Sequence, residues 1–429
     1  MIRLRSLPLL AAIVLFAAPC VLAEEAKPPT GPLSLQQIID ITMKNETNVI
    51  TARNNVLIAK GRKAEALSSY LPQLSIQSNV FQAGSGSVLN KSTNGTAFSV
   101  NQNIFDGGLR EANNSQARYG VTQNSASLSR TVQDVTYSVT KAYYEVLRSK
   151  HLSDVADANV KYTEGLRDQI QERATLGDVA KVDVLPMEAQ LANARVSLLS
   201  AQNAVRTASL QLQNAMGLSP ESGFDVQEAP AAPGIEVKPF ESYVSTAVTV
   251  RPDVLESAAN TGAARASVKA ARINLYPRPV ITGQYQRQIQ GGFTTSGGQV
   301  IGGIVFDLFN GGANRAVYKQ AQASQANAMQ QQQQVVKDIQ AQVQEAYLNL
   351  TNAKERTAAS EVGLTAAQAN YDAQKDRYGQ GVATPLDLLN AEVQLITAQS
   401  NSVQARYDYY IAIAQMDFSV GKQGGFNAN

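Results

Sequence analysis

The stretch RYGQGVATPLDLLNAEVQL, from Arg377 to Leu395, holds the end of one long helical pattern and the start of another. A related stretch, RATLGDVAKVDVLPMEAQL, runs from Arg173 to Leu191. In each copy the first pattern breaks at Gly and the second begins at an Asp, Asp387 or Asp183. Because Gly commonly ends helices and Asp favours their N-termini, each copy predicts the tip of a helical hairpin.

Apolar residues on both sides of the tips follow the alternating three- and four-residue steps of coiled coils. The steps are seen at Leu128, Val132, Val135, Val139, Ala142 and Val146, and again at Val336, Ile339, Val343, Ala346, Leu350 and Ala353. A helix that continues to Thr175 after Gly108 is about 100 Å long at 1.5 Å per residue. We expect long antiparallel coiled-coil helices, whose small Ala and Val seam residues suit close side-by-side packing.

Four short segments of alternating residues, two before each long helix, indicate strands of about ten residues, a length that spans a bilayer when tilted. They are Ile76 and Val80; Phe98, Val100, Gln102 and Ile104; Ile281, Gly283, Tyr285 and Ile289; Gly302, Ile304, Phe306 and Leu308. A Gly/Ser/Asn-rich loop at 83–95 separates the first two. Four strands leave unpaired sheet edges, which lipid does not tolerate, so we expect several chains to share one barrel. The polar alternate positions from Gln284 to Gln290 would face its water-filled interior.

Matching features of the two halves are separated by a constant shift of 204 residues, which indicates an internal duplication. The shift relates Asp183 to Asp387, Phe105 to Phe309 and Val135 to Ile339. We predict a signal peptide at 1–23, an extended leader at 24–33, a first repeat at 34–218, a linker at 219–239, a second repeat at 240–420 and a tail at 421–429.

The N-terminus has the basic, apolar and small-residue regions of a secretory signal, with cleavage expected after Ala23. Cys20 follows Pro19, which fits a lipid-attachment site poorly, and its removal leaves a mature chain without Cys. The net charge of +2 gives no reason to expect nucleic acid. A single His and the lack of any catalytic motif argue against an enzyme, a cofactor or a nitrogen/sulfur metal site.

Motifs at fixed spacing make the chain resemble the outer-membrane efflux family, the TolC-like channels, from Leu33 to Gly421. They are the strand ends IFDGG and LFNGG, the two tips, and the duplication. The resemblance implies a mainly α fold with a membrane β part: a homotrimer with a twelve-stranded barrel in the outer membrane and an α-helical tunnel through the periplasm of a Gram-negative-type envelope. It also implies a periplasmic adaptor (membrane fusion) protein and an inner-membrane RND-type pump or ABC exporter as partners.

The same resemblance implies roles for residues at the tips. Asp387 matches an acidic position that rings the closed aperture, and Asn390 occupies the position one turn later. Tyr378 and Asp183 match members of a polar latch between hairpins, although Ala383 stands where a basic latch residue is expected. The residues alone suggest a second role, because Thr384 to Asp387 has the form of a capping box and Asp183 is itself a candidate helix cap. The two roles are compatible.

The turns at 176–180 and 379–384 are small and turn-prone, so Gly177, Val179, Gly381 and Val382 are candidates for docking the adaptor. The second tip differs from the first at Tyr378, Thr384 and Asn390, which makes the second hairpin the candidate gate and the first its outer brace.

Two functions follow from these patterns. One is a passive exit duct for efflux or type I secretion of drugs, metal ions or polypeptides; the other is a periplasmic coiled-coil scaffold or adaptor without its own pore. Four alternating strands favour the duct, since a scaffold has no need of them.

Overall fold

The computed structural model describes residues 31–79, 95–177, 179–219, 223–230, 236–290 and 293–422. The predicted signal peptide with Cys20, most of the leader and most of the C-terminal tail lie outside these ranges. None of the helices within them is long and apolar enough to cross a membrane.

One order of elements, two short helices, two strands and two long helices, occurs twice along the chain. The first series is α1 (Leu35–Asn45), α2 (Thr47–Ser68), β2 (Gln73–Asn79), β3 (Gly95–Phe105), α3 (Leu109–Leu176) and α4 (Val184–Ala215). The second is α5 (Phe240–Val250), α6 (Pro252–Ile273), β5 (Arg278–Gln290), β6 (Phe293–Val305), α7 (Ala313–Gly379) and α8 (Pro385–Val420). The exact boundaries of the two repeats stay a prediction.

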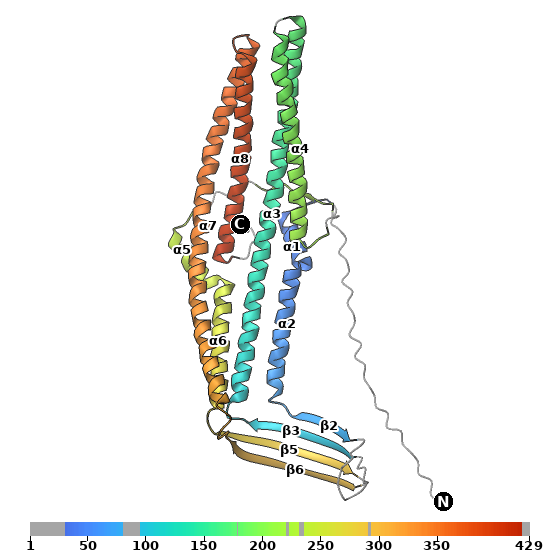
Figure 1. Ribbon diagram of the computed structural model, residues 1–429, viewed down its shortest axis with the longest axis vertical. Helices are drawn as coiled ribbons and strands as arrows, with labels where there is room; N and C mark the ends of the chain where they lie inside the picture. The colour runs from blue at the N-terminus through green and yellow to red at the C-terminus, as the bar shows by residue number, and fades with distance from the viewer. Residues whose placement is uncertain are drawn as a thin grey trace, which may run out of the picture.

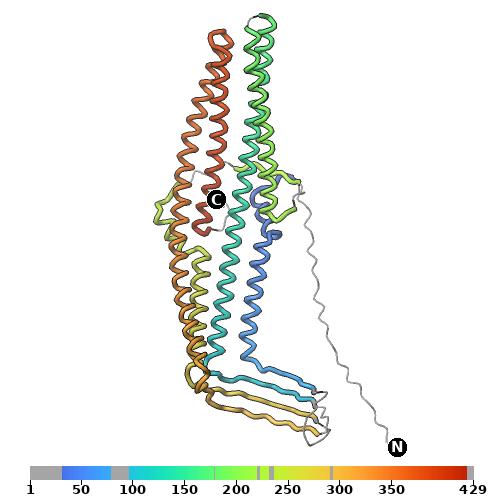
Figure 2. Tube along the Cα trace, in the orientation of Figure 1, coloured from blue at the N-terminus to red at the C-terminus, as the bar shows by residue number. Residues whose placement is uncertain are grey.

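The molecule is a long bundle of helices with a sheet at one end and two hairpin tips at the other (Figure 1). Helices α3 and α7 run the whole distance from the sheet to the tips, as the tube in Figure 2 shows. At 68 residues, α3 is about 100 Å long. Helices α4 and α8 return from the tips to about mid-height, below which α2 and α6 accompany the long helices (Figure 1).

The sequence predicts one helical pattern from Ser34 to Leu71, but the structure divides it at Glu46. Ser34 caps α1 in a capping box with Gln37, as expected of a capping residue. Glu46 has extended backbone geometry and its carboxylate accepts a hydrogen bond from the backbone N–H of Val49, so it starts a second helix. The Glu46 carboxylate therefore accepts a hydrogen bond from the Val49 N–H, which in an unbroken helix would be donated to a backbone carbonyl of the same helix.

Most of the predicted heptad positions are buried in the seams of the long helices, whereas Leu128, Val132, Ala142 and Val336 are half-buried. In α7, the residues Ile339, Val343, Ala346, Leu350 and Ala353 are all buried. They pack against Tyr409, Ala412 and Met416 of α8, which belong to the returning seam. The periodicity prediction is confirmed, because a stripe that repeats every three to four residues faces one neighbouring helix along its length.

Part of the linker at 219–239 packs on the helices near mid-height. Its strand β4 (Asp225–Val226) pairs in parallel with β1 (Pro32–Leu33) of the leader. The hydroxyl of Tyr143 donates to the backbone oxygen of Gln227 at 2.7 Å, and that of Tyr410 donates to Pro230 at 2.6 Å. These bonds attach the described linker residues to both hairpins.

The four strands form one antiparallel sheet in the order β2-β3-β5-β6, and its two faces differ in polarity. Directly paired residues share a face. One face carries Gln73, Ser75, Gln77, Ser99, Asn101, Thr282, Gln284, Gln286, Gln288 and Gln299. The other carries Leu74, Ile76, Phe98, Val100, Ile281, Tyr285, Ile289, Val300 and Ile304, with Arg287 as its charged exception and with Thr96, Thr294 and Ser296 as polar members. Val280 and Ile301 are apolar members of the first face. The predicted alternation is therefore present, and strands β2 and β6 are the two edges.

The prediction that Phe306 and Leu308 belong to the fourth strand is wrong. Strand β6 ends at Val305, which pairs with Arg278, the first residue of β5. The residues just before Arg278 form the turn that follows α6 and not a strand. The residues after Val305 therefore have no strand beside them to pair with. Val80 and the loop at 83–94 lie outside the described ranges, and Gly95 already belongs to β3.

Candidate functional site

Both hairpin tips turn at a glycine with positive φ. Gly177 follows α3 with φ +85°, and Gly381 follows α7 with φ +73°. No neighbouring atom lies within 4 Å of the place where a Cβ would be added at either glycine. Their requirement for Gly is therefore one of backbone conformation rather than of space.

The second tip contains the predicted capping box. The backbone N–H of Asp387 donates to the Thr384 hydroxyl at 3.2 Å, and the backbone N–H of Thr384 donates to the Asp387 carboxylate at 3.0 Å. The Thr384 hydroxyl also lies 2.6 Å from the same carboxylate. These hydrogen bonds from Thr384 hold the pKa of Asp387 below its ordinary value. Asp387 is thus both capping residue and persistent negative charge.

The first tip has no equivalent cap, so the prediction that Asp183 caps α4 by its side chain is wrong. A single 3₁₀ turn, Lys181–Asp183, precedes α4 and places Asp183 in helical backbone geometry. Its side chain makes no capping hydrogen bond, since a cap needs the extended backbone that Thr384 has at the second tip. Pro186 lies in the first turn of α4, where a proline is tolerated.

Asp387 and Asn390 lie one turn apart on α8, and both are exposed. Leu388 and Ala391, on another side of the same helix, are buried. The helix thus directs its acidic and amide side chains away from the packed surface, which leaves them free to face an aperture.

Tyr378 of the second hairpin contacts Arg173 of the first hairpin and forms no hydrogen bond with Asp183. The Arg173 guanidinium on α3 lies over the Tyr378 ring, 4.9 Å from its centroid. The ring is 4% exposed, and its buried hydroxyl has no hydrogen-bond partner among the described residues. A hydroxyl–carboxylate bond between Tyr378 and Asp183 is therefore not formed.

An apolar cluster, here called the tip cluster, joins the two hairpins below their turns. Its members come from all four hairpin helices: Leu166, Ile170 and Ala174 of α3; Val184 and Met187 of α4; Tyr371 and Tyr378 of α7; Leu388, Ala391 and Leu395 of α8. Because these residues are buried within one chain, the tip cluster holds the two hairpins of a single chain together.

Glu392 of α8 is a buried carboxyl group beside the tip cluster that the sequence reasoning missed. It is 3% exposed, and burial raises its pKa to about 7. The Thr163 hydroxyl of α3 lies 3.3 Å from its Oε1, and its Oε2 has no partner. The signal was available, because Glu392 falls within the apolar stripe of Leu388, Ala391 and Leu395.

The four candidate docking residues differ in accessibility. Val382 is 63% exposed and Gly177 and Gly381 are exposed, whereas Val179 is partly buried against the tip cluster. Large apolar side chains are also exposed at Leu176, which begins the predicted docking turn at 176–180, and at Val182, Leu185 and Leu386, which lie outside the predicted turns. Together they give both tips an apolar surface.

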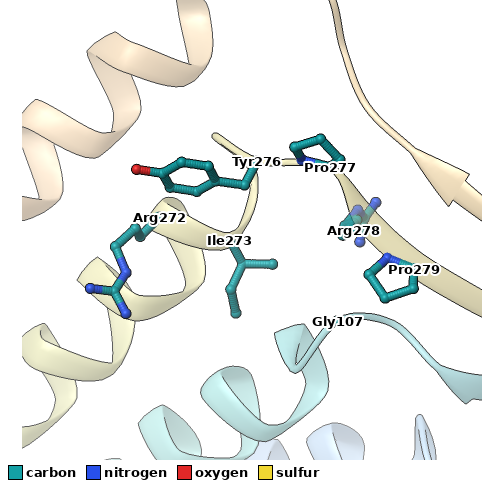
Figure 3. A pocket seen from close by; sticks show the side chains of 7 residues that line it. All are labelled: Gly107, Arg272, Ile273, Tyr276, Pro277, Arg278 and Pro279. Atoms are coloured by element: carbon teal, nitrogen blue, oxygen red, sulfur yellow. The ribbon is translucent and has the colours of Figure 1, made fainter.

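A cavity of about 420 Å³ lies at the other end of the helices, where α6 meets β5. Figure 3 shows Arg272 and Ile273 at the end of α6 and Tyr276 in the turn after it, with Pro277 and Pro279 on the strand side. The residues that line it include no carboxylate and no candidate from the sequence. The cavity therefore plays no part in the arrangement at the tips.

Long hairpins carried on a sheet with one apolar and one polar face define a class of protein, the outer-membrane channels with a helical periplasmic part. The chain belongs to the outer membrane efflux protein family, whose model matches residues 43–218 and 243–422. The resemblance inferred from the motifs is thereby confirmed, as are the fold class and the outer-membrane location.

Individual relatives and structures agree with this assignment. The outer membrane efflux protein BepC of Brucella suis is 25% identical over 376 residues, covering 86% of this chain and 81% of BepC. The outer membrane protein TolC of Escherichia coli is 24% identical over 378 residues, covering 81% of this chain and 74% of TolC. The open-state structure of the MtrE outer membrane channel of Neisseria gonorrhoeae matches with a TM-score of 0.75 at 20% identity, over 91% of this chain and 89% of MtrE.

Proposed function

We propose that three copies of this chain form the outer-membrane exit duct of a tripartite efflux or type I secretion system, closed at its periplasmic end by the hairpin tips. The observation that carries the proposal is the combination of an incomplete two-faced membrane sheet with long hairpins that end in a capped acidic tip. The family assignment supports the channel function and not the alternative of a scaffold without a pore.

The sheet supports the trimer. Its edges, β2 and β6, present unpaired backbone groups, and each such group costs several kcal/mol in lipid. Pairing β6 of one copy with β2 of the next removes every edge when the ring closes. Three copies supply twelve strands, with the apolar face toward lipid and the Gln-rich face toward water. A heat-modifiable trimer in outer-membrane fractions is the expected result, and a monomer would contradict it.

The second hairpin supplies the gate in this proposal. Exposed Asp387 and Asn390 of three copies would surround the axis, and a ring of carboxylates favours cations. The low pKa of Asp387 keeps that ring charged at neutral pH. Arg173 over Tyr378 and the tip cluster would hold the gating hairpin against the first, which acts as its brace.

Single-channel recording in planar bilayers tests the gate. Asp387→Asn is expected to lower cation selectivity, because it removes the negative charge and keeps the size of the side chain. Asp183→Asn, at the matching place on the first hairpin, is the control and should leave the selectivity unchanged. Equal behaviour of the two variants would refute the assignment of the gate.

The tips also supply the docking surface for a periplasmic adaptor, which connects the duct to an inner-membrane RND-type pump or ABC exporter. Their exposed Leu176 and Val382 fit an apolar helical hairpin of the adaptor. In-cell crosslinking should weaken when Gly177 or Gly381 is replaced by Val, while Gly363→Val on the exposed shaft of α7 should not affect it. Persistent crosslinking in the tip variants would count against this surface.

A further inference from the structure

Capping, packing and the proposed aperture ring offer no role for Glu392. It is a buried carboxyl group with one oxygen unpartnered, and it lies where α8 of the second hairpin meets α3 of the first. Buried carboxyl groups are stable when neutral or fully hydrogen-bonded, and destabilise their surroundings when ionised without partners. Its protonation state therefore bears directly on the contact between the two hairpins.

The hydrogen-bond geometry favours the protonated form. The Thr163 hydroxyl has one proton to donate, and the backbone oxygen of Asn159 lies closer to it, at 2.9 Å, than Glu392 Oε1 does, at 3.3 Å. Asn159 Oδ1, at 3.2 Å, is also closer to the hydroxyl than Glu392 is, so the hydroxyl supports an ionised Glu392 only weakly. The second carboxyl oxygen, Oε2, has no donor among the described residues.

No neighbouring cation compensates a negative charge here. Among the described residues, Glu392 makes no ion pair, and the causes that act on its pKa are burial, which raises it, and the Thr163 hydroxyl, which lowers it. The titratable groups that face it are Tyr162 of α3 and Tyr371 of α7, which interact electrostatically with its carboxyl group. Both phenols stay neutral near pH 7, because burial raises the pKa of each.

We propose that Glu392 is a further gating residue: its protonated form locks α8 against α3, and loss of the proton drives the two hairpins apart. The physical reason is that an ionised carboxylate gains water by leaving the contact, whereas the neutral group can stay buried at little cost. Since three copies surround one axis in the proposed trimer, three such locks act on one aperture. The inference rests on the proposed gate at the second hairpin.

The sign of the pH dependence follows. The pKa of the buried group, about 7, lies above the ordinary value of 4.5, so the locked state is favoured at low pH and weakens as the pH rises through about 7. The periplasmic end of the duct should therefore open more readily above neutral pH than below it.

Distance measurement between spin labels tests the lock in the reconstituted full-length protein. Labels on Lys161→Cys of α3 and Val393→Cys of α8 sit on exposed positions beside Thr163 and Glu392, and Cys20 of the predicted signal is the sole natural cysteine. From pH 5.5 to 8.5 the population with separated labels should rise by about tenfold or more. Glu392→Gln, which is neutral at every pH, should hold the short distance throughout.

Two controls distinguish failure of the proposed Glu392 lock from a general effect of the substitution or a failure to assemble. Glu188→Gln makes the same chemical change at an exposed residue of α4 and should retain the pH response of the natural chain. A heat-modifiable trimer checks that each variant assembles. An unchanged distance in the natural chain, or an equal response in Glu392→Gln, would overturn the lock. Unaltered selectivity of Asp387→Asn would instead overturn the aperture ring, whatever the labels report.

Discussion

Replacing Glu392 by Gln should stabilise the protein above neutral pH, independently of any effect on opening. The pKa of the buried carboxyl group is about 7 against an ordinary 4.5, and a difference of one in pKa corresponds to 1.36 kcal/mol. Ionisation of every buried Glu392 in place would therefore cost about 3 kcal/mol per chain. This figure is an upper value, because movement of the helix toward water relieves part of the cost.

The sign is set by linkage. A carboxyl group whose pKa is raised on folding contributes its full stability below the unfolded value of 4.5 and loses it as the pH rises to about 7. The thermal midpoint of the natural chain should accordingly fall between pH 5 and pH 8 more than that of Glu392→Gln. At pH 5, where the carboxyl group is largely protonated, the two proteins should be close in stability.

Circular dichroism of the purified protein, heated at several pH values, measures this difference in the thermal midpoint. Other groups also titrate in the range, so Glu188→Gln serves as the reference for a glutamate that is exposed. The pH dependence of Glu188→Gln should match that of the natural chain. A Glu392→Gln variant whose midpoint falls with pH as steeply as the reference would refute the reasoning that the carboxyl group is buried and uncompensated.

Three further outcomes are expected. Thr384→Val removes the hydroxyl that lowers the pKa of Asp387, so Asp387 should become protonated, and cation selectivity in bilayer recordings should be lost, at a higher pH than in the natural chain. An unchanged pH at which half of the selectivity is lost would contradict the capping box. Gly217→Ala should lower the thermal midpoint more than Gly177→Ala, because both have positive φ but only at 217 does a Cβ meet backbone, 2.8 Å from Asn45 O. Leu350→Ala, in the buried α7 seam, should cost about 2–5 kcal/mol of unfolding free energy in denaturant titrations, and a change below 1 kcal/mol would deny its burial.

Much of the fold follows from local pattern. The heptad steps at Ile339, Val343 and Leu350 predict the buried seam of α7, because the period of a helix decides which residues share a face. The alternation from Ile281 to Ile289 predicts a two-faced strand for the same reason. The Thr384 capping box could be predicted because its hydrogen bonds join residues only three positions apart.

The sequence predictions were wrong where the same local pattern suited two different structures. The break at Glu46 interrupts an apolar pattern that suits one helix, and only the cap on Val49 N–H reveals it. The end of β6 at Val305 depends on where β5 begins on the other side of a turn. Asp183 resembles Asp387 by duplication, yet the 3₁₀ turn before it gives the two Asp residues different backbones.

By itself, the sequence determined the duplication, the long hairpins, the alternating strands and the capped acidic tip, since each of these depends on residues near one another in the chain. Only the tertiary structure decided which side chains meet between hairpins: Arg173 lies over Tyr378, and Glu392 meets Thr163, 229 positions earlier. The physical reason is that a side chain is buried only if a partner helix covers it. The periodicity of one helix does not specify how that partner helix is rotated or how far it is shifted along its axis. A glutamate in an apolar stripe becomes a proton-dependent contact only when another helix covers it.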